Sequence, residues 1–224
     1  MTKGELARYI DQTNLKPGMT ESFIEEFCRK AVEQGFASVC ILPNMVPVAA
    51  RVLKGTQTKV CTVISFPLGA DVPSIKIAEA DDAIAKGAEE LDIVINVAAL
   101  KSGKKEIVME ELDGVVKAAH DHGCIVKAII ETPLLTEDQI REAAMLAEES
   151  GADIVKTSTG FSPILKRSTT VEDVKLIRSV IKPETGVKAA GGIRTTADAL
   201  AMIEAGATRV GASAGDEIVS GLDG

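Results

Sequence analysis

The chain has 224 residues, a length that suits one large domain or two small ones. Hydrophobic residues make up 46% of it and charged residues 26%, which is the balance of a folded globular protein and excludes general disorder. The net charge of −8 and the aromatic content of 3% argue against nucleic acid as the main partner, because phosphate backbones and bases are bound by clustered cations and aromatic rings.

The first residues, MTKGELARYIDQT, contain no apolar run, and no later apolar stretch approaches the ~18 residues of a membrane helix. We therefore expect a cytoplasmic protein with no membrane partner, whose four widely spaced cysteines stay reduced. His120 and His122 are the only histidines. A Ser-His-Asp triad or a multi-histidine metal site would have to use this pair, which disfavours both. Their place at a predicted helix end favours contacts with the last carbonyls of that helix.

Short apolar runs rich in Val and Ile alternate with amphipathic segments along the whole chain. Eight runs predict buried parallel strands, because most of them are continuously apolar. These runs are residues 8–11, 37–43, 59–66, 90–96, 125–131, 153–159, 187–191 and 208–213. Residues 20–35, 106–120, 136–151 and 195–206 repeat apolar side chains with the period of a helix.

Helix-start and helix-stop residues frame these segments. The predicted N-caps are Thr20, Thr136 and Thr195, and the glycines predicted just past helix ends are Gly35, Gly87, Gly151 and Gly206. Eight strand-helix units without a linker predict one α/β domain, residues 1–224, folded as a single (β/α)8 TIM barrel. A doubly wound open sheet is the alternative, but the sequence RYIDQTNLKPG lacks the glycine-rich loop that follows the first strand of that fold.

Charged residues within the predicted strands indicate a functional site, since burying an isolated charge is costly. The lysines are Lys127, Lys156 and Lys188 of the fifth to seventh strands, and the acids are Asp11, Asp92 and Glu131. One interpretation is a structural network of ion pairs. The other is that neighbouring ammonium groups and burial lower the pKa of one lysine, so that its free amine attacks a carbonyl and forms a Schiff base. The residues alone do not decide which lysine attacks.

Two glycine-rich stretches after the seventh and eighth strands are typical of phosphate-binding loops, because backbone N–H groups before a helix bind anions. The stretch AAGGIRTTADAL contains Gly191 and Gly192, and GASAGDEI contains Gly211 and Ser213. Gly160, after the sixth strand, would add a backbone donor. GASAG also fits the GxSxG pattern of serine hydrolases, but both histidines are expected at the opposite end of the barrel. We interpret the glycines as a phosphate site, with tight turns as the alternative.

In combination, eight stretches resemble the deoxyribose-phosphate aldolases, a family of class I (Schiff-base) aldolases. The stretches are IDQTNLKP, VCILPNMVPVA, SFPLGA, ELDIVINVAALKSG, KAIIETPLLT, GADIVKTSTGF, VKAAGGIRTTADA and GASAG. The resemblance implies a barrel that reversibly cleaves 2-deoxy-D-ribose 5-phosphate to D-glyceraldehyde 3-phosphate and acetaldehyde. It also implies a homo-oligomer, dimer or tetramer, that uses no metal and no organic cofactor.

The resemblance assigns roles to single residues. Lys156 matches the Schiff-base lysine, Lys188 the neighbour that perturbs the pKa of that lysine and exchanges protons, and Asp92 the proton-relay carboxylate. Lys127 and Asp11 would support this group. The phosphate would lie against Gly160, Gly191, Gly192, Gly211 and Ser213.

Four positions depart from the family pattern and leave efficiency and substrate preference open. They are Gln12, Leu42, Ser65 and Ala214, where many members have His, Asn, Gly and Ser. Two further functions stay possible: a Schiff-base aldolase for another sugar phosphate, and a barrel that binds a sugar phosphate without turnover. The presence of Lys156, Lys188 and Asp92 argues against the second.

Overall fold

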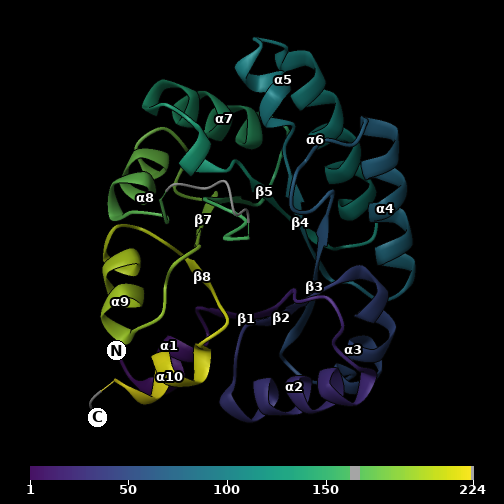
Figure 1. Ribbon diagram of the computed structural model, residues 1–224, viewed down its shortest axis with the longest axis vertical. Helices are drawn as coiled ribbons and strands as arrows, with labels where there is room; N and C mark the ends of the chain where they lie inside the picture. Colours follow the sequence, from purple (N-terminus) through teal and green to yellow (C-terminus); the bar gives the residue numbers. More distant parts are fainter. Residues whose placement is uncertain (162–166, 223–224) are drawn as a thin grey trace.

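The computed structural model describes residues 1–161 and 167–222, which form a closed barrel of eight parallel strands (Figure 1). The strands are β1 Ile10–Asn14, β2 Ser38–Ile41, β3 Lys59–Ile64, β4 Glu90–Val94, β5 Ile125–Ile129, β6 Ile154–Lys156, β7 Gly186–Ala190 and β8 Arg209–Ala212. Each strand pairs with the next along the chain, and β8 pairs with β1, so closure leaves no edge strand. The predicted (β/α)8 TIM barrel is confirmed.

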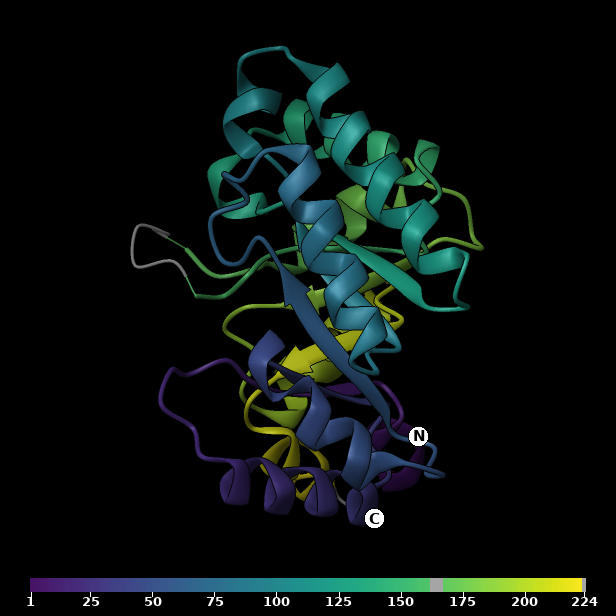
Figure 2. The same ribbon diagram turned by 90° about the vertical axis from the view of Figure 1, so that its right-hand side faces the viewer.

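Helices surround the barrel and carry the chain from the end of one strand to the start of the next (Figures 1 and 2). They are α1 Lys3–Ala7, α2 Glu21–Gln34, α3 Val46–Leu53, α4 Pro73–Ala85, α5 Val97–Lys101, α6 Lys105–His120, α7 Glu137–Glu149, α8 Val171–Arg178, α9 Thr196–Glu204 and α10 Gly215–Ser220, with 3-10 turns η1 Pro43–Met45 and η2 Thr132–Leu134. In the described part of the chain, no helix combines the length and the apolar character needed to cross a membrane.

The predicted helix boundaries are confirmed at atomic detail. Thr20 caps α2 by accepting a hydrogen bond from the Phe23 N–H, and Thr136 and Thr195 form capping boxes at α7 and α9. All four glycines predicted past helix ends have a positive φ, between 74° and 109°, which ends a helix at little cost only for glycine.

The second to fifth strands each end two residues before the expected bound, so Glu131 lies after β5 and not within it, and two other strand predictions need a larger correction. The first strand was expected over residues 8–11 and to end at Asp11, but β1 runs on to Asn14 because the preceding residues form α1 and its turn. The sixth strand was expected over residues 153–159, but β6 ends at Lys156. The polar residues after Lys156 leave the sheet, which frees them to form a loop at the carboxyl end of the barrel.

The interior of the barrel has an apolar side and a charged side. Leu15, Cys40, Cys61 and Val63 form a small apolar cluster along β2 and β3. The large hydrophobic core lies outside this, between the strands and the helices. The remaining strands bring buried charges into the interior, and these form the candidate site.

Candidate active site

Strand register places the three predicted lysines side by side inside the barrel. Lys127 on β5 lies opposite Asp92 on β4, and Lys156 on β6 lies opposite Lys188 on β7. Residues paired in register on neighbouring strands point to the same face of the sheet. Lys127 and Lys188 are fully buried, and Lys156 is 3% exposed. The fold thus gathers charges that are far apart in the sequence.

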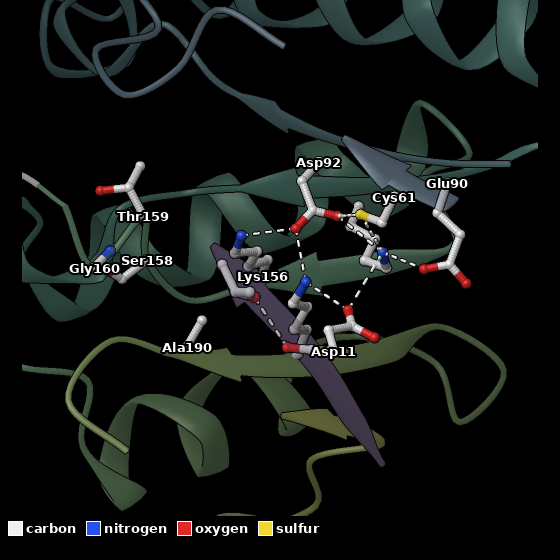
Figure 3. Close-up of polar contacts among 12 residues, drawn as sticks. Asp11, Cys61, Glu90, Asp92, Lys156, Ser158, Thr159, Gly160 and Ala190 are labelled. Carbon is white, nitrogen blue, oxygen red and sulfur yellow. Dashed lines mark hydrogen bonds and ion pairs between the residues drawn. The ribbon is translucent and has the colours of Figure 1, made fainter. Parts of the chain in front are cut away.

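Asp92 lies at the centre of this group (Figure 3). Its Oδ2 accepts hydrogen bonds from both Lys156 Nζ and Lys188 Nζ, each at 2.7 Å. Its Oδ1 accepts a hydrogen bond from Lys127 Nζ at 2.9 Å and from the Cys61 thiol at 3.2 Å. Because one carboxylate oxygen holds two ammonium groups, Lys156 and Lys188 are direct neighbours.

Two more carboxylates and an arginine complete the charged network toward the amino ends of the strands. Lys188 Nζ lies 2.5 Å from Asp11 Oδ2, and Lys127 Nζ lies 2.6 Å from Glu90 Oε2. Arg209 bridges these acids, with its Nη2 2.5 Å from Asp11 and 2.7 Å from Glu90. With every group ionised, four cations face three carboxylates. The network then carries one excess positive charge.

The membership of the network differs from the sequence expectation at one acid. Glu131 was grouped with the lysines, yet its carboxylate accepts hydrogen bonds from Ser158 and Thr159 instead. Glu90 takes its place among the charges, and Arg209 adds the fourth cation. Both lie at the first residue of a strand, where a charged side chain is usually solvated, so neither was expected inside the barrel.

Electrostatics holds the network in its ionised form. Burial alone would raise the pKa of Asp92, but the charges of Lys127, Lys156 and Lys188 outweigh it and hold that pKa well below its usual range. The pKa of Asp11 is lowered in the same way. Burial would likewise lower the pKa of Lys127 and Lys188, but Asp11 and Asp92 raise both instead. The raised pKa of Lys188 favours a positive charge beside Lys156.

A cavity of about 500 Å³ opens at the carboxyl end of the strands, and Lys156 is the network lysine that lines it. All five predicted phosphate-binding residues line the same cavity: Gly160, Gly191, Gly192, Gly211 and Ser213. Lys16 and Arg194 add positive charge to its wall. Lys16 was not among the expected site residues, although it lies within the IDQTNLKP stretch.

The glycines of this cavity contribute in different ways. The N–H groups of Gly192 and Ser213 donate to no acceptor within residues 1–161 and 167–222, which leaves them available to an anion. Gly160 was expected to offer its N–H, but that N–H donates to Ser158 Oγ at 3.0 Å. A Cβ on Gly160 would lie 3.0 Å from the Cα of Gly191, so its role is close approach of two loops. Gly211 lies within β8, not after it.

The four departures from the family pattern have identifiable places. Gln12 Oε1 accepts a hydrogen bond from the Gly215 N–H and so ties β1 to α10. Leu42 packs against the apolar cluster of β2 and β3. Ser65 has a φ of 54° and donates to Asp71 from its hydroxyl. Ala214 precedes the first residue of α10 and makes no side-chain cap.

The histidines lie away from the cavity, before β5. His120 Nε2 is 3.0 Å from Asp153 Oδ2, and His122 Nδ1 is 3.0 Å from the carbonyl oxygen of Ala118. Cys40, Cys61 and Asp92 bring three possible metal-ligand atoms within 4.8 Å of one another. The three ammonium groups that contact Asp92 repel a cation, so this donor set does not fit a metal ion.

The chain was compared with known proteins. A profile of the DeoC/LacD family aldolases matches residues 6–221. The chain belongs to this family. The deoxyribose-phosphate aldolase of Thermococcus kodakarensis is 53% identical over 223 residues, covering 99% of this chain and 98% of that protein. That of Clostridium perfringens strain 13 is 52% identical over 221 residues, covering 99% and 97%.

Solved structures of aldolases share the fold. An aldolase named QR15 superposes with a TM-score of 0.90 at 45% identity, covering 96% of this chain and 95% of that one. The deoxyribose-phosphate aldolase of Aeropyrum pernix, whose structure is described as a unique tetramer, superposes with a TM-score of 0.89 at 34% identity, covering 98% and 91%. Family membership agrees with the resemblance that the eight stretches indicated.

Proposed function

We propose that this protein is a class I aldolase that reversibly cleaves 2-deoxy-D-ribose 5-phosphate to D-glyceraldehyde 3-phosphate and acetaldehyde, with Lys156 as the Schiff-base residue. One observation carries the proposal: Lys156 faces the cavity and shares a single Asp92 oxygen with the buried Lys188. The names of relatives about 50% identical over nearly the full chain support the substrate.

The contacts of the three lysines distinguish their roles. Lys127 contacts three carboxylates, Lys188 contacts two, and Lys156 contacts one. Attack by the Lys156 amine on a carbonyl therefore breaks a single ion pair, fewer than attack by either other lysine would break. Lys156 is also the one of the three that a substrate in the cavity can reach. Both arguments select Lys156 as the free amine.

The chemistry follows from an amine placed beside a carboxylate. Lys156 adds to the C1 aldehyde of the open-chain sugar, and loss of water from the carbinolamine gives a protonated imine. When the 3-hydroxyl loses its proton, the C2–C3 bond breaks, and its electron pair passes to the imine and forms an enamine. The three-carbon product, glyceraldehyde 3-phosphate, leaves first. Protonation of the enamine at C2 and hydrolysis then release acetaldehyde and restore Lys156.

The surrounding residues have separate tasks in these steps. Asp92 contacts Lys156 at 2.7 Å and is the group placed to pass protons during carbinolamine and imine formation. Lys188 carries a proton that it can donate through the same Asp92 oxygen and later take back. Lys127 forms an ion pair with Asp92, and Asp11 forms one with Lys188, and these contacts hold Asp92 and Lys188 in place. The residues of the chain thus supply the proton transfers that the reaction needs.

The cavity wall fits the phosphate end of the substrate. Glycine backbone on the loops after β6 and β7 and within β8 lines it, and N–H groups of Gly192 and Ser213 are available to anionic oxygens. The cations Lys16 and Arg194 in the cavity wall favour a phosphate ester. Binding energy from the phosphate would fix the reacting carbons beside Lys156.

Reductive trapping tests the proposal. Incubation with acetaldehyde and borohydride should convert the imine to a stable ethylated amine, and peptide mass mapping should place it on Lys156. A parallel incubation with dihydroxyacetone phosphate should give no adduct. Trapping of dihydroxyacetone phosphate instead would indicate an aldolase for another sugar phosphate. No adduct with either compound, or an adduct on a different lysine, would contradict the assignment.

We further propose that residues 1–224 act as one catalytic domain within a cytoplasmic homo-oligomer, a dimer or a tetramer. The cysteines are free thiols, which suits a reducing compartment. Leu68, Val72 and Ile75 are more than half exposed on the segment from β3 into α4, which gives a copy of the chain an apolar surface to bind. Light scattering after size exclusion tests this, and a monomer would contradict it.

A further inference from the structure

Glu131 is a buried carboxylate outside the charged network. It lies two residues after the end of β5, is 2% exposed, and has a φ of 57°, in the left-handed region. That conformation is disfavoured for residues other than glycine, and it persists at sites that need a particular side-chain direction. Here the backbone directs the carboxylate toward the loop that follows Lys156.

Three hydrogen bonds satisfy this carboxylate. Oε1 accepts one from Ser158 Oγ at 2.6 Å and one from the Thr159 N–H at 3.1 Å. Oε2 accepts one from Thr159 Oγ1 at 2.6 Å. No Lys or Arg within residues 1–161 and 167–222 forms an ion pair with it. Donors on two consecutive residues therefore balance its burial, which fixes the loop relative to β5.

The hydrogen bonds continue from this loop to the cavity. The Gly160 N–H donates to Ser158 Oγ at 3.0 Å, and the Phe161 N–H donates to Thr159 Oγ1 at 3.3 Å. The hydroxyls that contact Glu131 thus also hold the next two backbone units. Thr159, Gly160 and Phe161 line the cavity, where Gly160 meets Gly191 (Figure 3 labels Ser158, Thr159 and Gly160).

Lys156 is positioned by other contacts. Its carbonyl oxygen accepts a hydrogen bond from the Ile130 N–H, its strand is paired in register with β7, and its Nζ is held by Asp92. Removing the charge of Glu131 leaves all of these contacts in place. Glu131, by contrast, accepts hydrogen bonds from Ser158 and Thr159 and so anchors the loop that contains Thr159 and Gly160.

We propose that Glu131 is a positioning residue that shapes the phosphate-binding loop through Ser158 and Thr159, and so sets the affinity for phosphate esters without acting on the Schiff-base step. The inference rests on the proposed function in taking a phosphate ester as substrate. Its ligand chemistry is a phosphate dianion, which the glycine loops bind through backbone N–H groups.

The substitution Glu131→Gln tests the role, because the amide keeps the size of the side chain and presents a donor to Thr159. We expect the dissociation constant of inorganic phosphate, measured by calorimetry, to rise about tenfold, as expected when a hydrogen bond to a charged group is lost. The KM for 2-deoxy-D-ribose 5-phosphate should rise with it while kcat changes little, the pattern of lost uniform binding. Reductive labelling of Lys156 by acetaldehyde, which has no phosphate, should be unchanged.

Ser158→Ala and Thr159→Val remove the two hydroxyls singly and should weaken phosphate binding in the same way, while Thr159→Ser restores it. Ser38→Ala is the matched control for Ser158→Ala, because Ser38 is equally buried and its hydroxyl has no hydrogen-bond partner among the described residues. Unchanged phosphate affinity in Glu131→Gln and Ser158→Ala would overturn the proposal, as would a parallel loss of acetaldehyde labelling. If the wild-type chain binds phosphate but cleaves no sugar phosphate, the proposed function fails and this inference is still decided by the calorimetry.

Discussion

Two regions of this molecule bury lysines with carboxylates, and they behave in opposite ways. Lys76 on α4 lies 2.6 Å from Glu111 on α6, and both side chains are fully buried between these helices, which pack side by side outside the barrel (Figure 2). There, burial lowers the pKa of Lys76 and raises that of Glu111, against the effect of each partner. In the barrel network the shifts run the other way.

The number of countercharges explains the difference. Lys76 and Glu111 each have one partner of opposite charge, plus the Val94 carbonyl oxygen and the Asn96 N–H, and this does not offset the loss of water. Lys127 contacts three carboxylates, and Asp92 contacts three lysines, so attraction exceeds the cost of burial. The Lys76–Glu111 pair joins two helices, whereas the barrel network places several charges that share partners beside a cavity.

The largest expected effect is on catalytic activity, at Lys156, the network lysine that lines the cavity. Lys156→Ala should lower kcat by about ten-thousandfold or more, because no other residue forms the covalent intermediate. Its unfolding free energy should change little, since one ion pair at the cavity is lost. A coupled assay for glyceraldehyde 3-phosphate measures the first quantity and urea unfolding the second. Lys54→Ala, at an exposed lysine, is the control, and near-normal turnover of Lys156→Ala would refute the assigned role.

The next effect is on stability, at the buried Lys76–Glu111 pair. Lys76→Met should lower the unfolding free energy by about 3–5 kcal/mol, because Glu111 stays buried without a countercharge. Lys76→Met with Glu111→Leu should recover most of that loss, since apolar side chains replace a costly pair. The kcat of the folded protein should stay normal in both variants. If the double variant did not recover stability, the attraction between Lys76 and Glu111 would exceed the cost of burying them, which would contradict this interpretation.

Lys188→Met should have the opposite profile to Lys76→Met: a large loss of activity and a smaller loss of stability. We expect kcat to fall by at least about a hundredfold, as for loss of a proton-transfer group. Stability should fall less than in Lys76→Met, because Asp11 keeps Arg209 and Asp92 keeps two lysines. Denaturant unfolding of the two variants side by side measures the difference. A larger stability loss in Lys188→Met would show that the network lacks this redundancy.

The smallest effect is a pH dependence of stability. Asp11 and Asp92 have lowered pKa values in the folded chain, so the unfolded chain binds more protons in the acid range. Their contribution, on the order of 2 kcal/mol each, should be complete above about pH 5 and lost as the pH falls toward the folded values. Urea unfolding between pH 3 and pH 7 measures the slope. Asp11→Asn should reduce the slope of unfolding free energy against pH. An unchanged slope would mean that groups other than Asp11 cause the pH dependence.

Much of the fold and part of the site could be predicted because their signals are local. Apolar runs marked the strands, and threonine and glycine marked helix ends such as those of α7. The end of β1 was placed too early because its second half, Gln12 to Asn14, is polar; Thr13 and Asn14 line the cavity. Lys156 and Asp92 stood out as charges within apolar strands.

Membership of the network could not be predicted, because it depends on strand register and on side-chain direction. Glu131 follows the same strand as Lys127, yet its left-handed backbone turns it toward the Ser158 loop. Glu90 and Arg209 begin strands that are distant in sequence and meet inside the closed barrel. Neither arrangement has a signature in a single segment of the chain.

The ion pair between Arg209 and Asp11 lies across the seam where the last strand meets the first. Lys188 on β7 also pairs with Asp11 on β1, so the network draws on strands from both ends of the chain. A chain that stops before β8 would leave Asp11 without its arginine and Lys188 without the glycine against which its side chain packs. In this protein, the pairing of β8 with β1 that closes the barrel also completes the charged network.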